Sequence, residues 1–399
     1  MSSTVLSNES ALYVAPGGPV YRFMRRLALD RHGQVSVLRR IILLISITWL
    51  PMCIFAILQG FALGATPRES FLLDFAAYAR YFIALPLMIF ADGIIGPRLR
   101  LAGLQFVRDG LVGPQDMPAF EQAVARLASR RESVTATVVT IALALFGAWQ
   151  LTFESATGVA NVASWQTFNL PGNHALSYPL AALWSHLVAL PVFLFFLYRW
   201  LWRLIFWTLF LFDVSRIELR LVPTHADGAG GLGFLEIAHV SFGTLAFAAT
   251  SVLSAQAAFR IVYEGAGLKT FQGPVIIVFL VILVLFLGPL LLFSPMMNRT
   301  WRAAMRSYGS LVVHYNRGFH EKWVDKSGPP GEPLLGSADI QSLADLGNSF
   351  RFVNDMKIVP LSRWAFIYLA LATVLPGLPL VLLVVPVSEI IDALAKVAL

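Results

Sequence analysis

Seven long apolar stretches limit what this chain can fold into. A helix needs about 20 mostly apolar residues to cross a hydrocarbon core about 30 Å thick. Hydrophobic residues make up 57% of the chain and charged residues 13%, whereas a soluble domain carries about 25% charged residues. The sequence therefore predicts an all-α, polytopic membrane protein with about seven transmembrane helices. The expected spans lie near residues 41–63, 73–96, 134–153, 178–198, 236–258, 274–296 and 364–387.

The distribution of basic residues predicts the orientation of these spans. If the N-terminus lies in the cytoplasm, 25 of the 30 Lys and Arg residues fall in inner segments. Such an excess is typical of cytoplasmic loops, so we expect a cytoplasmic N-terminus and a periplasmic C-terminus. Residues 1–40 then form a cytoplasmic basic segment and 41–399 a helical transmembrane bundle, with a cytoplasmic helical insertion at 298–363.

The inner end of the fourth span has two interpretations. The apolar character continues past Arg199 and Arg203. Residues 199–212 either continue the fourth span as a long tilted helix or turn into the membrane interface. On the same side, apolar residues at helical spacing predict an amphipathic helix between Asp116 and Glu132.

The fifth span is unusual because small residues replace the bulky ones found elsewhere. Between Gly243 and Ala258 it is built mainly from Gly, Ala and Ser. Small side chains let helix backbones approach closely in lipid. We therefore expect this span at the centre of the bundle.

A glycine-rich turn, PTHADGAGGLGFL, precedes this span. Gly228, Gly230 and Gly233 match G-x-G-x-x-G, but no βαβ unit surrounds them, so a dinucleotide site is rejected. Two interpretations remain. In the first, the glycines serve only a tight turn, with Glu236 satisfying the helix N-terminus. Alternatively, backbone N–H groups at the helix start bind an anion. The expected ligand-binding residues are then His225, Asp227, Gly228, Gly230, Gly231 and Arg220.

A metal site is the second hypothesis for the same region. Glu236 and His239 have the Glu-x-x-His spacing that places both side chains on one helical face. His225 and Asp227 would complete a four-ligand site for a divalent metal. The alternative is that these polar residues cap the helix or meet water. Apart from this hypothetical metal, no cofactor is predicted.

Two ionisable residues are expected within the membrane. Arg80 lies in the second span and His186 near the middle of the fourth. Such residues are costly in hydrocarbon and suggest function, so both are placed along a solute route. The structural alternatives are an arginine that reaches the interface and a neutral histidine that bonds to another helix.

PTHADGAGGLGFL and a second stretch, GSADIQSLADLGNSF, together about thirty residues, resemble an uncharacterised group of bacterial multi-pass inner-membrane proteins. The resemblance implies a bacterial inner membrane and carries over no activity and no catalytic residue.

Three functions therefore remain open. The leading hypothesis is binding or translocation of a small anionic solute. The alternatives are a membrane-embedded metal-dependent enzyme acting on a lipid or phosphorylated substrate, and an accessory or signalling subunit.

The common hydrolase motifs are absent from the sequence, so no catalytic residue is assigned. No internal repeat is evident, which argues against an inverted-repeat transporter. Expected partners are the lipid bilayer and a small solute, with a homo-oligomer or partner subunit as further options; nucleic acid is not expected.

Overall fold

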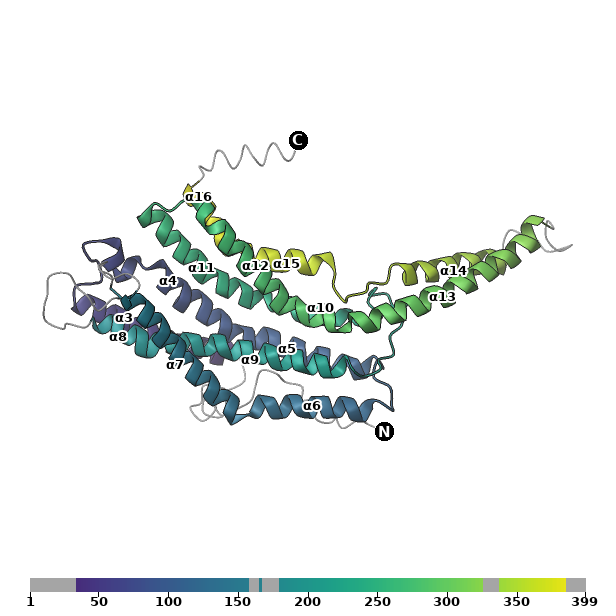
Figure 1. Cartoon of the computed structure of the whole chain (residues 1–399), viewed down its shortest axis with the longest axis horizontal. Helices are drawn as coiled ribbons and strands as arrows, with labels where there is room; N and C mark the ends of the chain where they lie inside the picture. The colour runs from purple at the N-terminus through teal and green to yellow at the C-terminus, as the bar shows by residue number, and fades with distance from the viewer. Residues whose placement is uncertain (1–33, 158–164, 167–178, 326–336, 385–399) are drawn as a thin grey trace.

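The chain folds into a bundle of long helices from which a helical hairpin projects (Figure 1). The structure, a computed structural model, describes residues 34–157, 165–166, 179–325 and 337–384. Within these ranges the regular elements are helical, and the extended pairing is a single bridge between Val112 and Leu219. Seven helices of the described part are long and apolar enough to cross a membrane. The prediction of an all-α, multi-pass membrane protein is therefore confirmed.

The first four spans differ in regularity. The first and third are continuous helices, whereas short π-helical segments interrupt the second and fourth. Their elements are α3 (Gln34–Leu58); α4 (Phe75–Tyr78), η4 (Ala79–Ala84) and α5 (Leu85–Arg108); α7 (Val134–Thr157); and α8 (Leu180–Trp184), η5 (Ser185–Ala189) and α9 (Leu190–Val214). Residues 199–212 continue the fourth span as one helix.

The last three spans are also segmented. The fifth contains α10 (Gly233–Val240) and α11 (Gly243–Glu264). The sixth contains η6 (Leu268–Phe271), α12 (Gln272–Leu287) and η7 (Gly288–Phe293), and it runs directly into α13 (Ser294–Phe319) and η8 (His320–Asp325). The seventh contains α15 (Arg363–Val374), η9 (Leu375–Gly377) and α16 (Leu378–Val384).

The projecting hairpin, which we call the arm, consists of α13 and α14 (Ala338–Asn354) (Figure 1). Asp339 joins its two helices near the tip. The Asp339 carboxylate accepts hydrogen bonds from Lys322 Nζ and Trp323 Nε1, both at 2.8 Å, and its backbone oxygen accepts one from the Tyr315 hydroxyl at 3.1 Å. The arm defines two ends of the bundle. The arm end contains the start of α10, and the far end contains the start of α4 and η6.

The amphipathic helix predicted between Asp116 and Glu132 is α6 (Met117–Glu132). Its apolar face packs on α9, where the rings of Phe120 and Phe210 lie 6.0 Å apart. Arg126 and Arg130 on α6 both reach the carboxylate of Asp213, at 3.1 and 3.8 Å. The helix therefore packs against the bundle through both apolar and charged contacts.

The small-residue helix α11 lies between the second span on one side and α15 on the other (Figure 1). A Cβ atom on Gly243 would be 3.1 Å from Tyr368 Cε1 and 3.4 Å from Ala372 Cβ. This distance leaves little room for a larger residue. The close approach predicted from the small side chains is therefore confirmed at Gly243.

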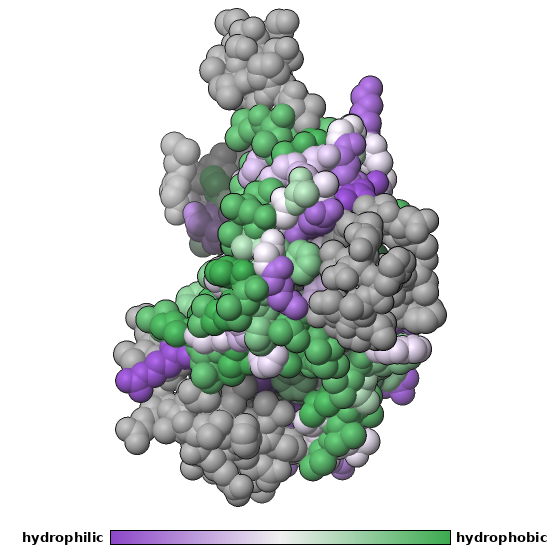
Figure 2. Space-filling model, turned by 90° about the vertical axis from the view of Figure 1, so that its left-hand side faces the viewer, coloured by the Kyte–Doolittle hydropathy of each residue, from purple (hydrophilic) through white to green (hydrophobic). Residues whose placement is uncertain are grey.

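Large apolar side chains cover the outside of the bundle. Val284 on α12, for example, is 72% exposed, and Leu187 in η5 is 65% exposed. Figure 2, which looks at the far end, shows apolar residues over much of the described surface. Such a surface suits contact with lipid chains rather than water.

Three expectations fall outside the described residues. They concern most of the basic N-terminal segment, residues 326–336 of the predicted insertion, and the end of the chain beyond residue 384.

Candidate functional site

The glycine-rich turn, residues 223–233, is organised around the carboxylate of Asp227. Its Oδ1 atom accepts hydrogen bonds from the N–H groups of Ala229 (2.7 Å) and Gly231 (3.2 Å). Its Oδ2 atom accepts one from the N–H group of Gly233 (2.8 Å), the first residue of α10. A carboxylate is favourable at a helix N-terminus, where N–H groups lack partners within the helix. Asp227 therefore satisfies this terminus, where the tight-turn interpretation had placed Glu236.

The surroundings of Asp227 keep it ionised. Burial opposes the charged form, but the three backbone hydrogen bonds and the neighbouring His225 together outweigh burial. The pKa of Asp227 consequently lies below its ordinary value. His225 Nδ1 lies 2.8 Å from Asp227 Oδ1. The chain's own carboxylate thus occupies the position that an anion would take at this turn.

The glycines of the turn serve the backbone. Gly228, Gly230 and Gly231 have positive φ angles of 61°, 67° and 97°, which side chains disfavour. The carbonyl oxygen of Gly228 accepts a hydrogen bond from the N–H group of Lys357 (2.8 Å), which fixes the segment after α14. These observations favour the tight-turn interpretation of the glycines.

Arg220, the sixth residue predicted for this site, packs elsewhere. Its backbone N–H group donates to the carbonyl oxygen of Leu111 at 2.7 Å. Its guanidinium group lies against Gly113, where an added Cβ atom would come within 2.9 Å of Nε. The structure brings His225 and Asp227 together. It packs Arg220, in contrast, against the segment that connects α5 and α6.

Glu236 joins the fifth span to the seventh. Its Oε2 atom accepts a hydrogen bond from the N–H group of Ser362 (2.6 Å), and its Oε1 atom accepts one from the Ser362 hydroxyl. Ser362 is the residue before α15. Glu236 therefore caps the helix of another span.

His239 lies at a fully buried junction of three spans. Trp207 Nε1 on α9 donates a hydrogen bond to His239 Nε2 at 3.0 Å, and His239 Nδ1 lies 2.5 Å from the carbonyl oxygen of Phe286 on α12. An indole N–H group only donates, so Nε2 must accept and Nδ1 must carry the hydrogen. Both ring nitrogens are therefore engaged, and the arrangement requires a neutral imidazole.

The four residues predicted to bind a metal consequently fall into three places. His225 and Asp227 lie in the turn, Glu236 meets Ser362, and His239 lies between Trp207 and Phe286. Across the described residues, no group of three or more His, Cys, Asp and Glu side chains is placed to hold a metal ion. The Glu-x-x-His spacing does not form the expected four-ligand site, because each member has another partner.

The second and fourth spans share a local irregularity. Each has a π-helical segment followed by Leu and Pro, at Ala84-Leu85-Pro86 and Ala189-Leu190-Pro191. Proline has no N–H group and disturbs the helical hydrogen bonds of the preceding turn. Within helices, π-helical turns are rare and occur often at functional sites. A short repeat, which was not evident from the sequence alone, thus marks these two spans.

Arg80 and His186 lie in these two π-helical segments. The Arg80 guanidinium is 5.8 Å from the ring centre of Phe193 on α9, so it bridges the second and fourth spans. His186 Nε2 lies 3.4 Å from the backbone oxygen of Gln166. The side chain of Gln166 donates to Asp74 Oδ2 at 2.9 Å. Both residues predicted within the membrane therefore lie in a polar region at the far end of one helix pair.

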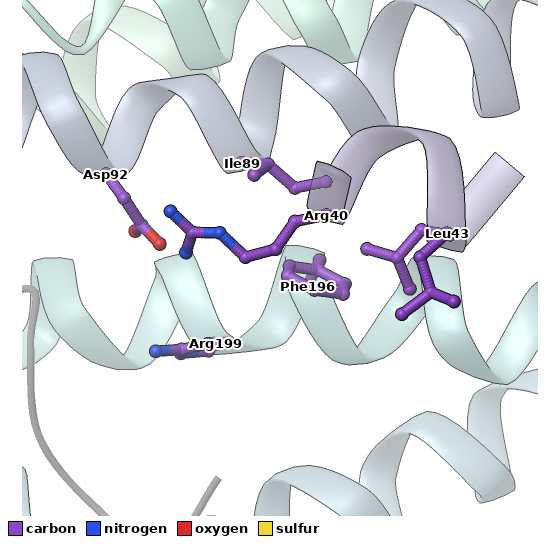
Figure 3. Close-up of a pocket in the computed structure, with 7 residues that line it drawn as sticks. Arg40, Leu43, Ile89, Asp92, Phe196 and Arg199 are labelled. Carbon is purple, nitrogen blue, oxygen red and sulfur yellow. The ribbon is translucent and has the colours of Figure 1, made fainter. Parts of the chain in front are cut away.

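A second polar cluster lies nearer the arm end of the same pair (Figure 3). Asp92 on α5 forms an ion pair with the buried Arg203 on α9. Figure 3 shows the Arg40 guanidinium, from α3, directed toward Asp92, with Arg199 on α9 close by. A cavity of about 40 Å³ opens here, enough for one or a few water-sized groups. We call it the arginine cavity; it is lined by Arg40, Leu43, Leu44, Ile89, Asp92, Phe196 and Arg199.

The charges of this cluster interact with one another. Arg203, Asp92 and Arg40 all act electrostatically on Arg199. Among these four residues there are three guanidinium groups and one carboxylate, so the cluster is positive overall. The Arg203 guanidinium also lies 4.6 Å from the ring centre of Trp200, whose Nε1 donates to the carbonyl oxygen of Met88 at 2.8 Å. The positive cluster is thus held by packing between the second and fourth spans.

The arginine cavity was not predicted from the sequence. Arg40, Arg199 and Arg203 were interpreted as part of the excess of positive charge that indicates the cytoplasmic side, and not as a binding site. A local signal was present. Arg199 and Arg203 are four residues apart, a spacing that places them on one helical face within an apolar stretch. The position of Asp92 against that face could not be read from the sequence.

Comparison with protein-family models, curated proteins and solved structures gives no match to this chain.

Proposed function

We propose that this multi-pass membrane protein binds a small anion, or the anionic group of a larger molecule, in the arginine cavity. The observation that carries the proposal is the placement of three guanidinium groups around one carboxylate between α3, α5 and α9. Guanidinium groups match the oxygens of carboxylates and phosphates, to which they can donate two parallel hydrogen bonds. Charges interact more strongly among apolar helices than in water. An anion would therefore balance the positive cluster.

Translocation is the wider form of this proposal. Arg80 and His186 lie on the same two spans as Asp92 and Arg199, toward the far end. Arg80 and Asp92 are separated by about 18 Å along the helix, as twelve residues rise 1.5 Å each. The polar residues on the second and fourth spans thus lie at two depths along one solute route. The helices beside this route are irregular and include π-helical segments.

We place the protein in a bacterial inner membrane with the arm end in the cytoplasm. The distribution of Lys and Arg and the resemblance of the two sequence stretches support this placement. Labelling tests the orientation in a Cys53→Ser background, which removes the single native cysteine. In intact cells, an impermeant maleimide should modify Thr270→Cys at the far end and leave Ser307→Cys on the arm unmodified. The opposite pattern would reverse the orientation.

Thermal unfolding of the purified full-length protein with phosphate, sulfate and carboxylate salts tests anion binding. At equal ionic strength, at least one anion should raise the unfolding temperature of the wild type. At 100 times its dissociation constant, a ligand stabilises the folded state by roughly 2.7 kcal/mol. Arg199→Gln should remove the response. Arg306→Gln, which removes the same charge from an exposed position on α13, should retain it. An equal response in Arg199→Gln would contradict the proposal, and so would the absence of any response to the free anions and to a larger molecule with an anionic group.

A further inference from the structure

We infer that the anionic group bound in the arginine cavity is the phosphate of a membrane phospholipid. This inference rests on the proposed function and names the class of its ligand. Free phosphate and a lipid headgroup offer the same phosphate oxygens to Arg40 and Arg199. The remaining lining of the cavity and its depth in the bundle distinguish these two sources.

The cavity has a charged part and an apolar part. Arg40, Asp92 and Arg199 provide the charged part. The apolar part consists of Leu43, Leu44, Ile89 and Phe196. Free phosphate in water would gain little from the apolar side chains, because it has no apolar surface to bury. A phospholipid has phosphate oxygens next to acyl chains and matches both parts.

The cavity also borders a side chain at the surface of the bundle. Leu43 lies one turn after Arg40 on α3, lines the cavity and is 39% exposed. Both residues belong to the first membrane span, Val37–Leu58. A lipid in the neighbouring bilayer can therefore approach the arginines along Leu43 without first entering water.

The depth of the charged groups fits a headgroup. Arg40 is the fourth residue of the first span, which places it about 5 Å from the start of that span. Trp202 lies three residues after Arg199 on α9 and is partly exposed. Arginine and tryptophan are typical of the membrane interface, where lipid phosphates lie. Basic pockets between transmembrane helices at this level suit anionic headgroups.

The test compares lipid and free phosphate on the detergent-solubilised full-length protein. Thermal unfolding is followed during titration with phosphatidylglycerol, phosphatidylcholine and inorganic phosphate at constant ionic strength. Wild type, Arg199→Gln, Arg40→Gln and the exposed control Arg306→Gln are compared. Circular dichroism and gel filtration of each variant show whether it is folded. Native mass spectrometry of the same samples counts bound lipid directly.

Phosphatidylglycerol should stabilise the wild type at concentrations at which inorganic phosphate has no effect. Its apparent affinity should fall by roughly tenfold or more in Arg199→Gln and Arg40→Gln, because each variant loses a charged hydrogen-bond donor. Arg306→Gln should bind like the wild type. Phosphatidylcholine should have a smaller effect, because its choline cation offsets the phosphate charge.

Other outcomes separate the two claims. If inorganic phosphate stabilises as well as phosphatidylglycerol, the lipid inference fails and anion binding in the cavity stands. If neither stabilises, both fail. Equal shifts with both phospholipids, or an undiminished phosphatidylglycerol shift in both arginine variants, would overturn the lipid inference, because binding would not depend on this cavity.

Discussion

The carboxylate of Glu236 in the fifth span caps the seventh span through Ser362, although 126 positions separate the two residues. One oxygen accepts from the Ser362 N–H group at 2.6 Å and the other from its hydroxyl. The contact fixes the start of α15 beside the start of α10. Two spans far apart in the chain are thereby joined at the arm end.

Loss of this cap should destabilise the bundle. Ser362→Ala removes the hydroxyl donor to the Glu236 carboxylate and should lower the free energy of unfolding by about 1.5 to 3 kcal/mol. Glu236→Gln replaces a charged acceptor and should cost about 1.5 to 3 kcal/mol. Denaturant unfolding in detergent measures both changes. Ser307→Ala is the matched control, since the exposed Ser307 hydroxyl donates to the Ala303 carbonyl oxygen of its own helix at 3.1 Å. A control as costly as Ser362→Ala would contradict the role of the cap.

Asp227 should make the protein sensitive to acid. Its folded-state pKa is lowered, so the stabilising contribution of the carboxylate is present above its unfolded pKa, about 3.9. That contribution decreases as the pH falls below this value toward the folded pKa. Wild-type thermal stability measured from pH 7 to pH 3 should therefore decline more steeply than that of Asp227→Asn. Asn should also reduce stability at pH 7, because one acceptor oxygen is lost. Parallel pH profiles would show that Asp227 does not carry this effect.

Trp207→Phe should leave a buried histidine nitrogen without its donor. Trp207 Nε1 donates to His239 Nε2, and no other donor to this atom lies in the part of the chain that the structure describes, so the substitution should cost about 1–3 kcal/mol in the free energy of unfolding. Trp364→Phe, at a position that is 64% exposed, provides the control and should change stability little. Nitrogen-15 NMR of labelled histidine should show the Nδ1–H tautomer of His239 in the wild type. Detection of the Nε2–H tautomer would contradict the hydrogen-bond assignment.

Alanine substitutions at two glycines with nearly the same φ angle distinguish the cost of backbone strain from the cost of side-chain clashes. Gly230 and Gly265 have φ angles of 67° and 68°, and an added Cβ atom on Gly265 meets nothing within 4 Å. On Gly230 it would lie 2.9 Å from Met356 Cε and 3.3 Å from Leu221 Cβ. Gly265→Ala should cost about 1–2 kcal/mol from backbone strain, and Gly230→Ala should cost more. Equal losses in denaturant unfolding would mean that Met356 and Leu221 move aside freely.

Asp92→Asn tests the charge balance of the arginine cavity. The substitution removes the carboxylate that pairs with the buried Arg203 and should destabilise the protein by about 3 kcal/mol. It also makes the cavity more positive, so added anions should stabilise the variant more than the wild type. Asp345→Asn on the exposed face of α14 should show neither effect. A smaller anion response in Asp92→Asn would count against anion binding at this cluster.

Properties that depend on residues close together in the sequence could be predicted from the sequence. The apolar stretches predicted the spans, the helical spacing around Phe120 predicted α6, and the small residues near Gly243 predicted a close helix contact. Each of these signals lies within one element. Hydrophobicity and side-chain size are sufficient to read them.

The candidate site depended on partners that local patterns do not reveal. Arg203 meets Asp92 across 111 positions, and His239 meets Phe286 across 47. The Glu-x-x-His spacing correctly placed two polar residues on one short helix, but their partners on three other spans determined what each does. The turn glycines likewise suggested that backbone N–H groups bind an anion. In the structure, these N–H groups donate to the carboxylate of Asp227 in the same turn.

The sixth span has a mechanical consequence. It passes into α13 without a loop, through the tighter 3-10 segment η7, which contains Gly288 and Pro289. Mid-helix segments of this kind often act as hinges. The 26 residues of α13 form a rod about 39 Å long, so a pivot of ten degrees at η7 would swing its tip through about 7 Å. A small tilt within the sixth span would therefore move the end of α13 by several ångströms.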